Sequence, residues 1–293
     1  MSEVDELVDV KNAFYIGNFA NTVKEAQKLK VSDPDVSVEK DAFMYRGYIA
    51  MRKFGVIRNE IDEDSHQNLR PLLTLSKYSE NKNSCKEEIL SEVEKSNIEG
   101  LISALVSASI YTHEGLYENT LRVLHSYSGN DNLEIAALKL QILLKMDRLD
   151  LAKKELKVIQ DIDDDATLTQ LAQAWVNMAI GGEKIQEAYY IYQELIEKFG
   201  STPILLNGQA ASFLAQEKFE EAEAALQEAL DKDSDNPDTL INLMVLSQQT
   251  GKPIEVYNRY MTQLKDHDPH HSFIKDCHDR ENDFNRLMAQ YAI

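Results

Sequence analysis

Residues Thr202 to Pro237 read TPILLNGQAASFLAQEKFEEAEAALQEALDKDSDNP, which is the pattern of one complete helical hairpin. Thr202 is a favourable N-cap, and Pro203 occupies the first helical position, where its missing N–H costs no hydrogen bond. Apolar residues recur at helical spacing on both sides of a polar turn at residues 216–218. Asn236 and Pro237 repeat the cap-and-proline signal 34 residues later, which is the period of the tetratricopeptide repeat.

Alanines stand where the helices of such a repeat approach one another closely. With Pro203 as position 1, repeat positions 8, 20 and 27 hold Ala210, Ala222 and Ala229. Position 20 falls on Ala188 one period earlier and on Val256 one period later, so the later copy is degenerate. The sequence therefore predicts three repeats at about residues 169–202, 203–236 and 237–270.

Helical periodicity continues through the rest of the chain, with irregular lengths before residue 100. One expected hairpin covers residues 40–54 and 56–61 and turns at Gly55. Two segments, Ser84 to Glu87 and Thr167 to Gln170, have the spacing of a capping box. The fold expected from these patterns is all-α: a curved, tetratricopeptide-like solenoid of helical hairpins over residues 1–270.

The last segment, residues 271–293, is expected to be a C-terminal capping helix. Phe284, Leu287, Met288 and Tyr291 fall on one face of this helix, and charged residues lie opposite. A helix with a polar outer side suits the open end of a solenoid.

Composition narrows the class of partner and compartment. The net charge of −19 over 293 residues disfavours nucleic acid or an anionic membrane surface as a direct partner. Two cysteines, Cys85 and Cys277, form no disulfide framework and suit a reducing compartment. The N-terminus lacks the pattern of a signal peptide, and no run approaches the roughly 20 apolar residues that span a bilayer. We therefore expect a cytoplasmic protein that does not insert into membranes and needs no homo-oligomer.

Candidate chemistry along the chain is weak. The run Gly181 to Lys184 resembles a phosphate loop but joins two helices and lacks the closing Ser/Thr, so we interpret it as a turn. His267, His270, His271, Cys277 and His278 match no standard zinc spacing and are read as solvated side chains. The aspartates of residues 161–165 lack the glycine and glutamate of a calcium loop and are read as an acidic linker. We predict no catalytic residue, no metal and no cofactor, and Trp175 is assigned to the core.

The remaining feature is the concave side of the array, which first helices line at repeat positions 2, 5, 6, 9, 12 and 13. In the three best repeats, positions 2, 5 and 6 hold no lysine or arginine, so the clamp for a carboxylate that chaperone adaptors need is missing. Such a groove suits an uncharged or apolar extended segment, with side-chain amides bonding its backbone. Some of these residues are expected only to pack between hairpins. The candidate partner-binding residues are Gln173, Asn177, Asn207, Ala211, Leu214, Ile241, Asn242 and Val245.

Several runs resemble the epsilon-subunit family of the coatomer vesicle coat. The resemblance covers essentially the whole chain and is weakest over residues 62–96. The runs that carry it are Asp9–Phe19 (DVKNAFYIGNF), Gln141–Leu156 (QILLKMDRLDLAKKEL), Asp165–Ala172 (DATLTQLA), Leu206–Ala211 (LNGQAA) and Glu281–Leu287 (ENDFNRL).

The resemblance implies a non-catalytic coat subunit of Golgi-to-endoplasmic-reticulum and intra-Golgi transport, peripheral on Golgi membranes and coated vesicles. It further implies that the helical repeats encircle a β-hairpin from the C-terminal domain of the coatomer alpha subunit. An uncharged groove agrees with such a partner.

Two classes of function stay open from the sequence. The first is a structural coat subunit that binds and stabilises the alpha subunit. The second is a tetratricopeptide adaptor or scaffold that docks short peptides of another partner, against which the missing basic clamp argues. An enzyme ranks third, because the array offers no activated nucleophile and no paired acid and base.

Overall fold

The computed structural model describes residues 5–62, 64–80, 86–95, 98, 100–127 and 132–291. Helices and short connections make up all of these residues, and no strand occurs among them, which confirms the predicted all-α class. The first half of the predicted capping box at Ser84, together with Cys85, lies outside the described residues. No helix in the described ranges has the length and apolar character to cross a membrane.

The chain divides into two compact units, which we call unit 1 (Met1–Leu195) and unit 2 (Ile196–Ile293). The expected division into residues 1–270 and 271–293 stays a prediction. Unit 1 contains α1 (Val8–Tyr15), α2 (Phe19–Lys28), α3 (Pro34–Ala50), α4 (Phe54–Glu60), α5 (Pro71–Glu80), α6 (Lys86–Lys95), α7 (Leu101–His113), α8 (Tyr117–Ser126), α9 (Leu133–Lys145), α10 (Leu149–Ile162), α11 (Thr167–Ile180) and most of α12 (Lys184–Phe199).

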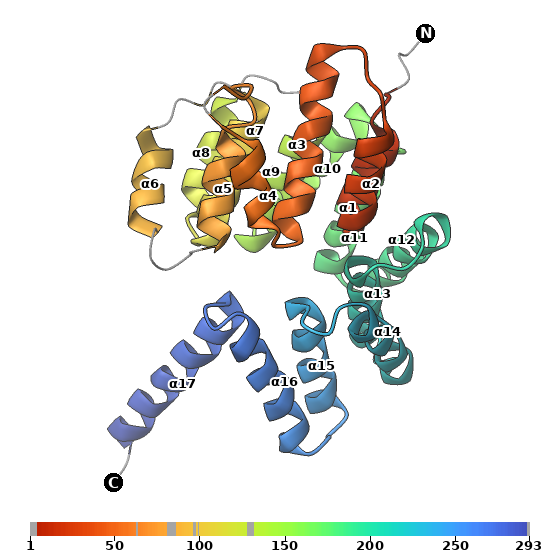
Figure 1. Ribbon diagram of the computed structural model, residues 1–293. Coiled ribbons are helices and arrows are strands. Elements are labelled where there is room, and N and C mark those ends of the chain that lie inside the picture. Colours follow the sequence, from red (N-terminus) through yellow and green to blue (C-terminus); the bar gives the residue numbers. More distant parts are fainter. Residues whose placement is uncertain are drawn as a thin grey trace. The chain divides into compact units, whose positions relative to one another are not determined.

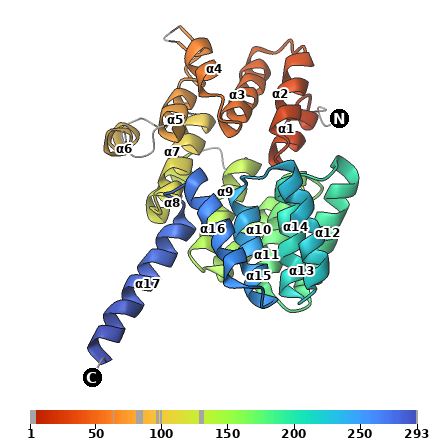
Figure 2. The ribbon, with the colours of Figure 1, turned by 60° about the horizontal axis from the view of Figure 1, so that its bottom comes forward.

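Unit 2 contains the end of α12 followed by five helices (Figure 1). They are α13 (Pro203–Ala215), α14 (Phe219–Lys232), α15 (Pro237–Gln249), α16 (Ile254–His267) and α17 (Ser272–Tyr291). Consecutive helices from α13 to α16 pack as antiparallel neighbours, and the first helices α13 and α15 also contact each other (Figure 2). This pattern is the hairpin solenoid that the 34-residue period predicts.

One turn motif connects the two helices of most hairpins. The chain passes through positive φ at Gly17, Gly115 and Gly251, and also at Arg52, Asp147 and Glu217. In each case the next N–H donates to the carbonyl five residues back, as from Lys218 to Phe213 at 3.0 Å. This is the Schellman closure of a helix C-terminus.

The expected turn at Gly55 is wrong. The structure ends α3 at Ala50, places Arg52 at φ 58°, and includes Gly55 in the first turn of α4. The start of α3 was also missed: Asp33 caps it and Pro34 follows, the same signal as Thr202 and Pro203. The helix boundary follows the cap and the Schellman hydrogen bonds rather than the position of glycine.

The capping-box prediction at Thr167 is also wrong. Ala166 is the N-cap of α11, without a side-chain hydrogen bond, and Thr167 lies inside the helix. The buried hydroxyl of Thr169 instead donates to the carbonyl of Asp163, at 2.5 Å. The hydroxyl therefore ties α11 to the end of α10.

Alanine packing agrees with the repeat register. Ala188, Ala210, Ala222 and Ala229 are each fully buried. Within unit 2, Ala210 and Ala222 belong to the buried cluster formed by α13 to α16, where a larger side chain would hold the helices apart. Trp175 packs against the buried cluster formed by α9, α10 and α11, as predicted.

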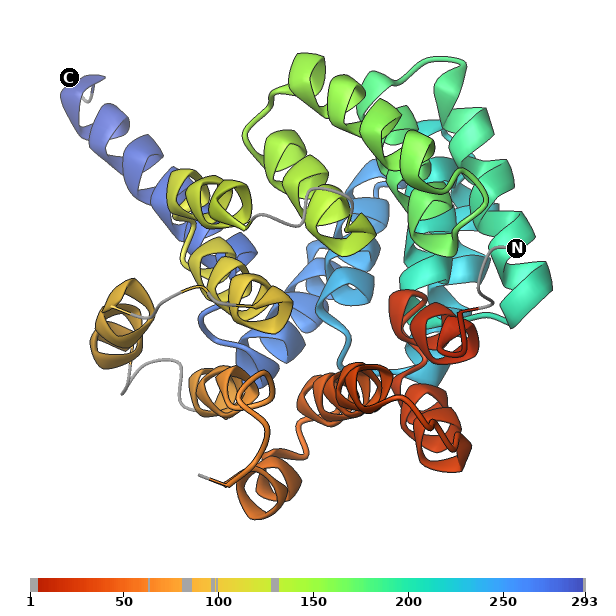
Figure 3. The same cartoon turned by 90° about the horizontal axis from the view of Figure 1, so that it is seen from above.

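In unit 1 the N-terminal helices also reach the middle of the chain. Helix α1 contacts α11, and Tyr15 packs against the cluster formed by α9, α10 and α11. Arg46 on α3 lies over the rings of Phe14 and Phe43, at 4.4 and 5.1 Å, and binds Glu134 on α9. An extended solenoid, whose hairpins contact only their neighbours, lacks such contacts. Figure 3 shows several helices of unit 1 nearly end-on, with short connections between them.

Candidate partner-binding surface

Charge separates the first and second helices of the three best repeats. The first helices α11, α13 and α15 hold a single charged residue between them, Asp238. The second helices carry many, for example five carboxylates on α14 alone. A partner segment without charge therefore meets the lowest desolvation cost along first helices.

Helices α13 and α15 are joined by a polar network centred on Asn207. The Asn207 side-chain amide donates to the carbonyl of Pro203 and to the Thr239 hydroxyl, both at 2.8 Å. Its oxygen accepts from Asn242, at 3.0 Å. Asn207 is 7% exposed, so these bonds satisfy a buried amide. The network holds α13 against α15.

The Thr239 hydroxyl was not among the predicted residues. It is fully buried and lies against Asn236, the N-cap of α15, whose oxygen accepts from the Thr239 N–H. The cap was visible in the sequence, but a threonine three residues later carries no signal that it faces α13.

Around this network the predicted apolar residues differ in exposure. Ile241 and Val245 on α15 are half-buried, and both pack against the cluster of α13 to α16. Ala211 on α13 is half-buried, and Leu214 is buried in the same cluster. Ile241, Val245, Asn242 and Ala211 thus offer accessible surface, whereas Leu214 and Asn207 serve mainly the packing of α13 and α15.

The two predicted residues of unit 1 form a separate chain of amides along α11. Gln160 donates to Gln173 at 3.1 Å, and Gln173 donates to Asn177 at 2.8 Å. Asn177 is 1% exposed and reaches Glu187 on α12 at 3.5 Å. Gln173 is half-buried, so of this pair it alone has appreciable surface.

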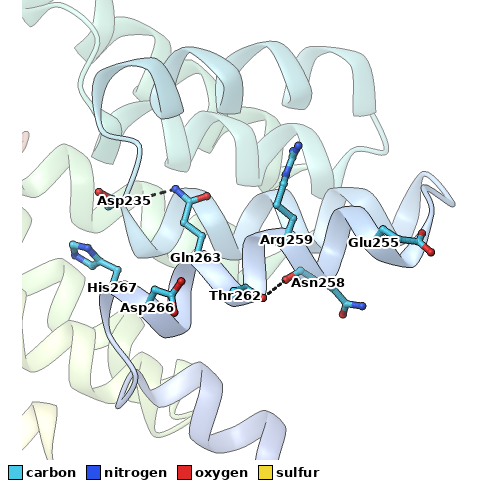
Figure 4. A pocket seen from close by; sticks show the side chains of 8 residues that line it. All are labelled: Asp235, Glu255, Asn258, Arg259, Thr262, Gln263, Asp266 and His267. Carbon is cyan, nitrogen blue, oxygen red and sulfur yellow. Dashed lines mark hydrogen bonds between the residues drawn. The ribbon is translucent and has the colours of Figure 1, made fainter.

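A separate cavity of about 790 Å³ lies along α16, open to solvent (Figure 4). Carboxylates of Asp235, Glu255 and Asp266 line it together with Arg259 and His267. The Gln263 side chain lies at one end of the cavity, and its amide donates to the carbonyl of Ser234 at 2.8 Å. Arg259 turns toward its neighbour and donates to the Tyr260 hydroxyl at 2.9 Å. These contacts are local to α16 and the turn before α15, and the cavity is not part of the candidate surface.

The titratable groups with shifted pKa values lie mainly in unit 1 and are structural. Glu114 illustrates this: burial favours a raised pKa, but hydrogen bonds from Lys86 and from the Tyr78 hydroxyl outweigh it and lower the pKa. The carboxylate thereby links α5, α6 and α7. Among the described residues no three His, Cys, Asp or Glu side chains are grouped as metal ligands.

The chain is similar to known proteins over almost its whole length. A family model described as coatomer epsilon subunit matches residues 3–292. The chain is 38% identical to "Coatomer subunit epsilon-1" of Arabidopsis thaliana, covering 100% of this chain and 99% of that protein. It is 33% identical to "Coatomer subunit epsilon" of Caenorhabditis elegans, covering 97% and 98%.

Solved structures agree on the fold. A tetratricopeptide repeat protein from Parabacteroides merdae superposes with a TM-score of 0.58 at 14% identity, covering 92% of this chain and 95% of that one. A chain from the APC/C hetero-tetramer Cut9-Hcn1 gives a TM-score of 0.63 at 12% identity, covering 92% and 54%. At these identities the likeness concerns the fold alone.

Proposed function

The chain belongs to the coatomer epsilon-subunit family, and on that premise we propose that it binds the C-terminal domain of the coatomer alpha subunit. Membership makes it a subunit of the coatomer coat. The proposal adds that its role is structural and non-catalytic, and that it supports retrograde Golgi-to-endoplasmic-reticulum and intra-Golgi transport. It would act in the cytoplasm, held on Golgi membranes through the rest of the coat.

The observation that carries the binding proposal is the surface of α13 and α15, on which Asp238 is the single charged residue of the two helices. Its accessible residues are apolar or amide side chains: Ile241, Val245, Asn242 and Ala211. An extended segment of the alpha subunit lying there would gain affinity from buried apolar area and from hydrogen bonds to Asn242. Gln173 on α11, in unit 1, is a separate candidate contact with an accessible amide.

The same observation disfavours a chaperone-type adaptor. Repeat positions 2, 5 and 6 are Ile204, Asn207 and Gly208 on α13, and Asp238, Ile241 and Asn242 on α15. None is a cation, so a terminal carboxylate would find no counter-charge.

The test is isothermal titration of the full chain with the purified C-terminal domain of the alpha subunit. Ile241→Asp combined with Val245→Asp should weaken binding at least about tenfold, because each side chain contributes about 1.5 to 3 kcal/mol when fully buried. The helical circular dichroism spectrum should be unchanged. Ala224→Asp with Gln227→Asp adds the same charge to the exposed face of α14 and should bind like wild type.

Salt dependence separates this surface from the charged second helices. Binding through apolar area and backbone hydrogen bonds should weaken only modestly as salt rises. If binding depended strongly on salt and the Ile241/Val245 variant bound normally, the interface would lie on the acidic second helices. That result would contradict the proposal.

A further inference from the structure

Helix α17 leaves the body of unit 2 after its first turns. Phe273 and Ile274 pack against the cluster of α13 to α16, and Cys277 contacts Tyr257 on α16. From His278 to Tyr291 every residue is exposed. Figures 1 and 2 both show α17 pointing away from α16 toward the C-terminus. Within α17, therefore, the residues that pack against the rest of unit 2 lie in its first turns, residues 272–277, which we call the root of α17.

Helix α16 departs from the small-residue pattern of the earlier second helices. At repeat position 27, where Ala229 of α14 is fully buried, α16 has Gln263. The Gln263 amide is held by the Ser234 carbonyl and the Asp235 carboxylate, at 2.8 and 3.3 Å. The small side chain that permits close helix packing in α14 is therefore missing at this position of α16.

The free part of α17 carries an apolar stripe. Phe284, Leu287, Met288 and Tyr291 are 61%, 49%, 56% and 81% exposed. They follow the i, i+3, i+4, i+7 spacing, so they share one face of the helix. A helical segment of this length without tertiary contacts is marginally stable in water, and its apolar face stays in solvent. Both facts indicate a surface that another protein covers.

The charges beside the stripe indicate the chemistry of that protein. On an ideal helix Glu281 borders one side of the stripe, and Asp276 and Asp283 border the other. Arg280 lies at its N-terminal end and Arg286 pairs with Asp283 at 2.9 Å, so three carboxylates stand against two cations along the borders. With a chain net charge of −19, the complementary surface is apolar and rimmed by lysine or arginine. A second copy of this acidic chain would bring like charges together.

The root of α17 packs against the same buried cluster as the surface of the proposed function. Phe273, Ile274, Ile241 and Val245 all pack against the same buried cluster. We propose that the apolar face of α17 is a second contact for the protein bound at α15, the C-terminal domain of the alpha subunit, through an apolar groove bordered by basic side chains. This inference rests on the proposed function, and the free helix becomes ordered in the complex.

The experiment compares variants of the full chain by titration with the C-terminal domain of the alpha subunit. Phe284→Ala with Leu287→Ala keeps helix propensity and should weaken binding about tenfold, which is about 1.4 kcal/mol. Asn282→Ala with Gln290→Ala, on the polar side of the same helix, should change it less than about twofold. Glu281→Lys with Asp283→Lys should slow association more than it speeds dissociation.

Hydrogen exchange supplies a second readout. Amides of residues 280–291 should exchange fast in the free chain and become protected in the wild-type complex. Protection confined to α13 and α15, with the Phe284/Leu287 variant binding like wild type, would overturn the inference and leave the proposed function standing.

Two other outcomes would also overturn the inference, each for a different reason. A wild-type chain that does not bind the domain at all would overturn the proposed function and this inference with it. Sedimentation showing a dimer of the free chain that Phe284→Ala with Leu287→Ala dissolves would assign the stripe to a second copy and likewise overturn it.

Discussion

Arg46 on α3 binds both carboxylate oxygens of Glu134 on α9, with N–O distances of 2.6 and 3.1 Å, across 88 residues of sequence. Both side chains are largely buried, with 16% and 11% of their surface exposed. The Phe14 and Phe43 rings flank the guanidinium. The pair thus connects the N-terminal hairpins of unit 1 with its middle hairpins.

Arg46→Met should lower the free energy of unfolding by about 3 kcal/mol, because it leaves the Glu134 carboxylate buried without a cation. Arg46→Met with Glu134→Leu should recover most of the loss. Urea unfolding measures both. Arg58→Met, which breaks the more exposed pair with Glu80, should cost less than about 1 kcal/mol. Equal losses for Arg46→Met and Arg58→Met would contradict the role of the buried pair.

Ala222→Arg should cost several kcal/mol, on the order of 3 to 5, because it overpacks a fully buried position and brings in an unpaired charge. Thermal unfolding should show a clearly lower Tm. Ala224→Arg, two residues along the same helix and exposed, is the matched control and should leave the Tm nearly unchanged. An unaltered Tm for Ala222→Arg would mean that the repeat register is wrong.

Asn207→Ala should destabilise unit 2 by about 1 to 3 kcal/mol, because the Thr239 hydroxyl and the Asn242 amide lose their partner. Chemical unfolding is the measurement, with the exposed Asn258→Ala as the control. Full stability combined with lost alpha-subunit binding would instead make Asn207 a direct partner contact.

Glu217→Gly should stabilise the chain by about 0.5 to 1 kcal/mol, because Glu217 adopts φ 60°, where a side chain is strained and glycine is not. Ala224→Gly, in the helix that follows, should destabilise by about 1 kcal/mol. If urea unfolding showed that Glu217→Gly and Ala224→Gly lower the free energy of unfolding by similar amounts, the turn at Glu217 would store no strain.

Alkaline pH should destabilise unit 1 partly through Tyr45. Burial, followed by the charge of Glu60 and a hydrogen bond to it, raises the pKa of Tyr45 to about 12. The pKa of a tyrosine in the unfolded chain is about 10. The contribution of Tyr45 to the free energy of unfolding is therefore complete below pH 10 and is lost as the pH rises through 12.

Tyr45→Phe should therefore flatten the fall in unfolding free energy between pH 10 and 12. Tyr190→Phe, at an exposed tyrosine, should leave the slope unchanged. Identical slopes for wild type and Tyr45→Phe would rule out this contribution.

The sequence predicted features that depend on near neighbours. Thr202 and Asn236 each accept a hydrogen bond from an N–H of the helix they cap, and Pro203 and Pro237 follow them. The alanine positions and the turn at Glu217 were also predicted correctly. Caps, prolines and helical spacing act over a few residues, so a single repeat contains all the information they need.

The candidate surface was predicted only as a set of positions on first helices. Whether a residue there faces a partner or a neighbouring helix depends on the packing of two helices. The side chains of Asn207 and Asn177 form hydrogen bonds within the protein, whereas those of Ile241 and Val245 remain partly accessible. The sequence pattern gives all four the same helical face.

By itself, then, the sequence determined the helical class, the 34-residue period and the caps, because these follow from backbone hydrogen bonds and side-chain spacing within one hairpin. Tertiary structure alone decided that Arg46 meets Glu134, that α1 reaches α11, and that α17 leaves the stack with its apolar stripe exposed. Such contacts depend on how successive hairpins are rotated against one another. That rotation results from the packing of all side chains between them, and no local pattern specifies it.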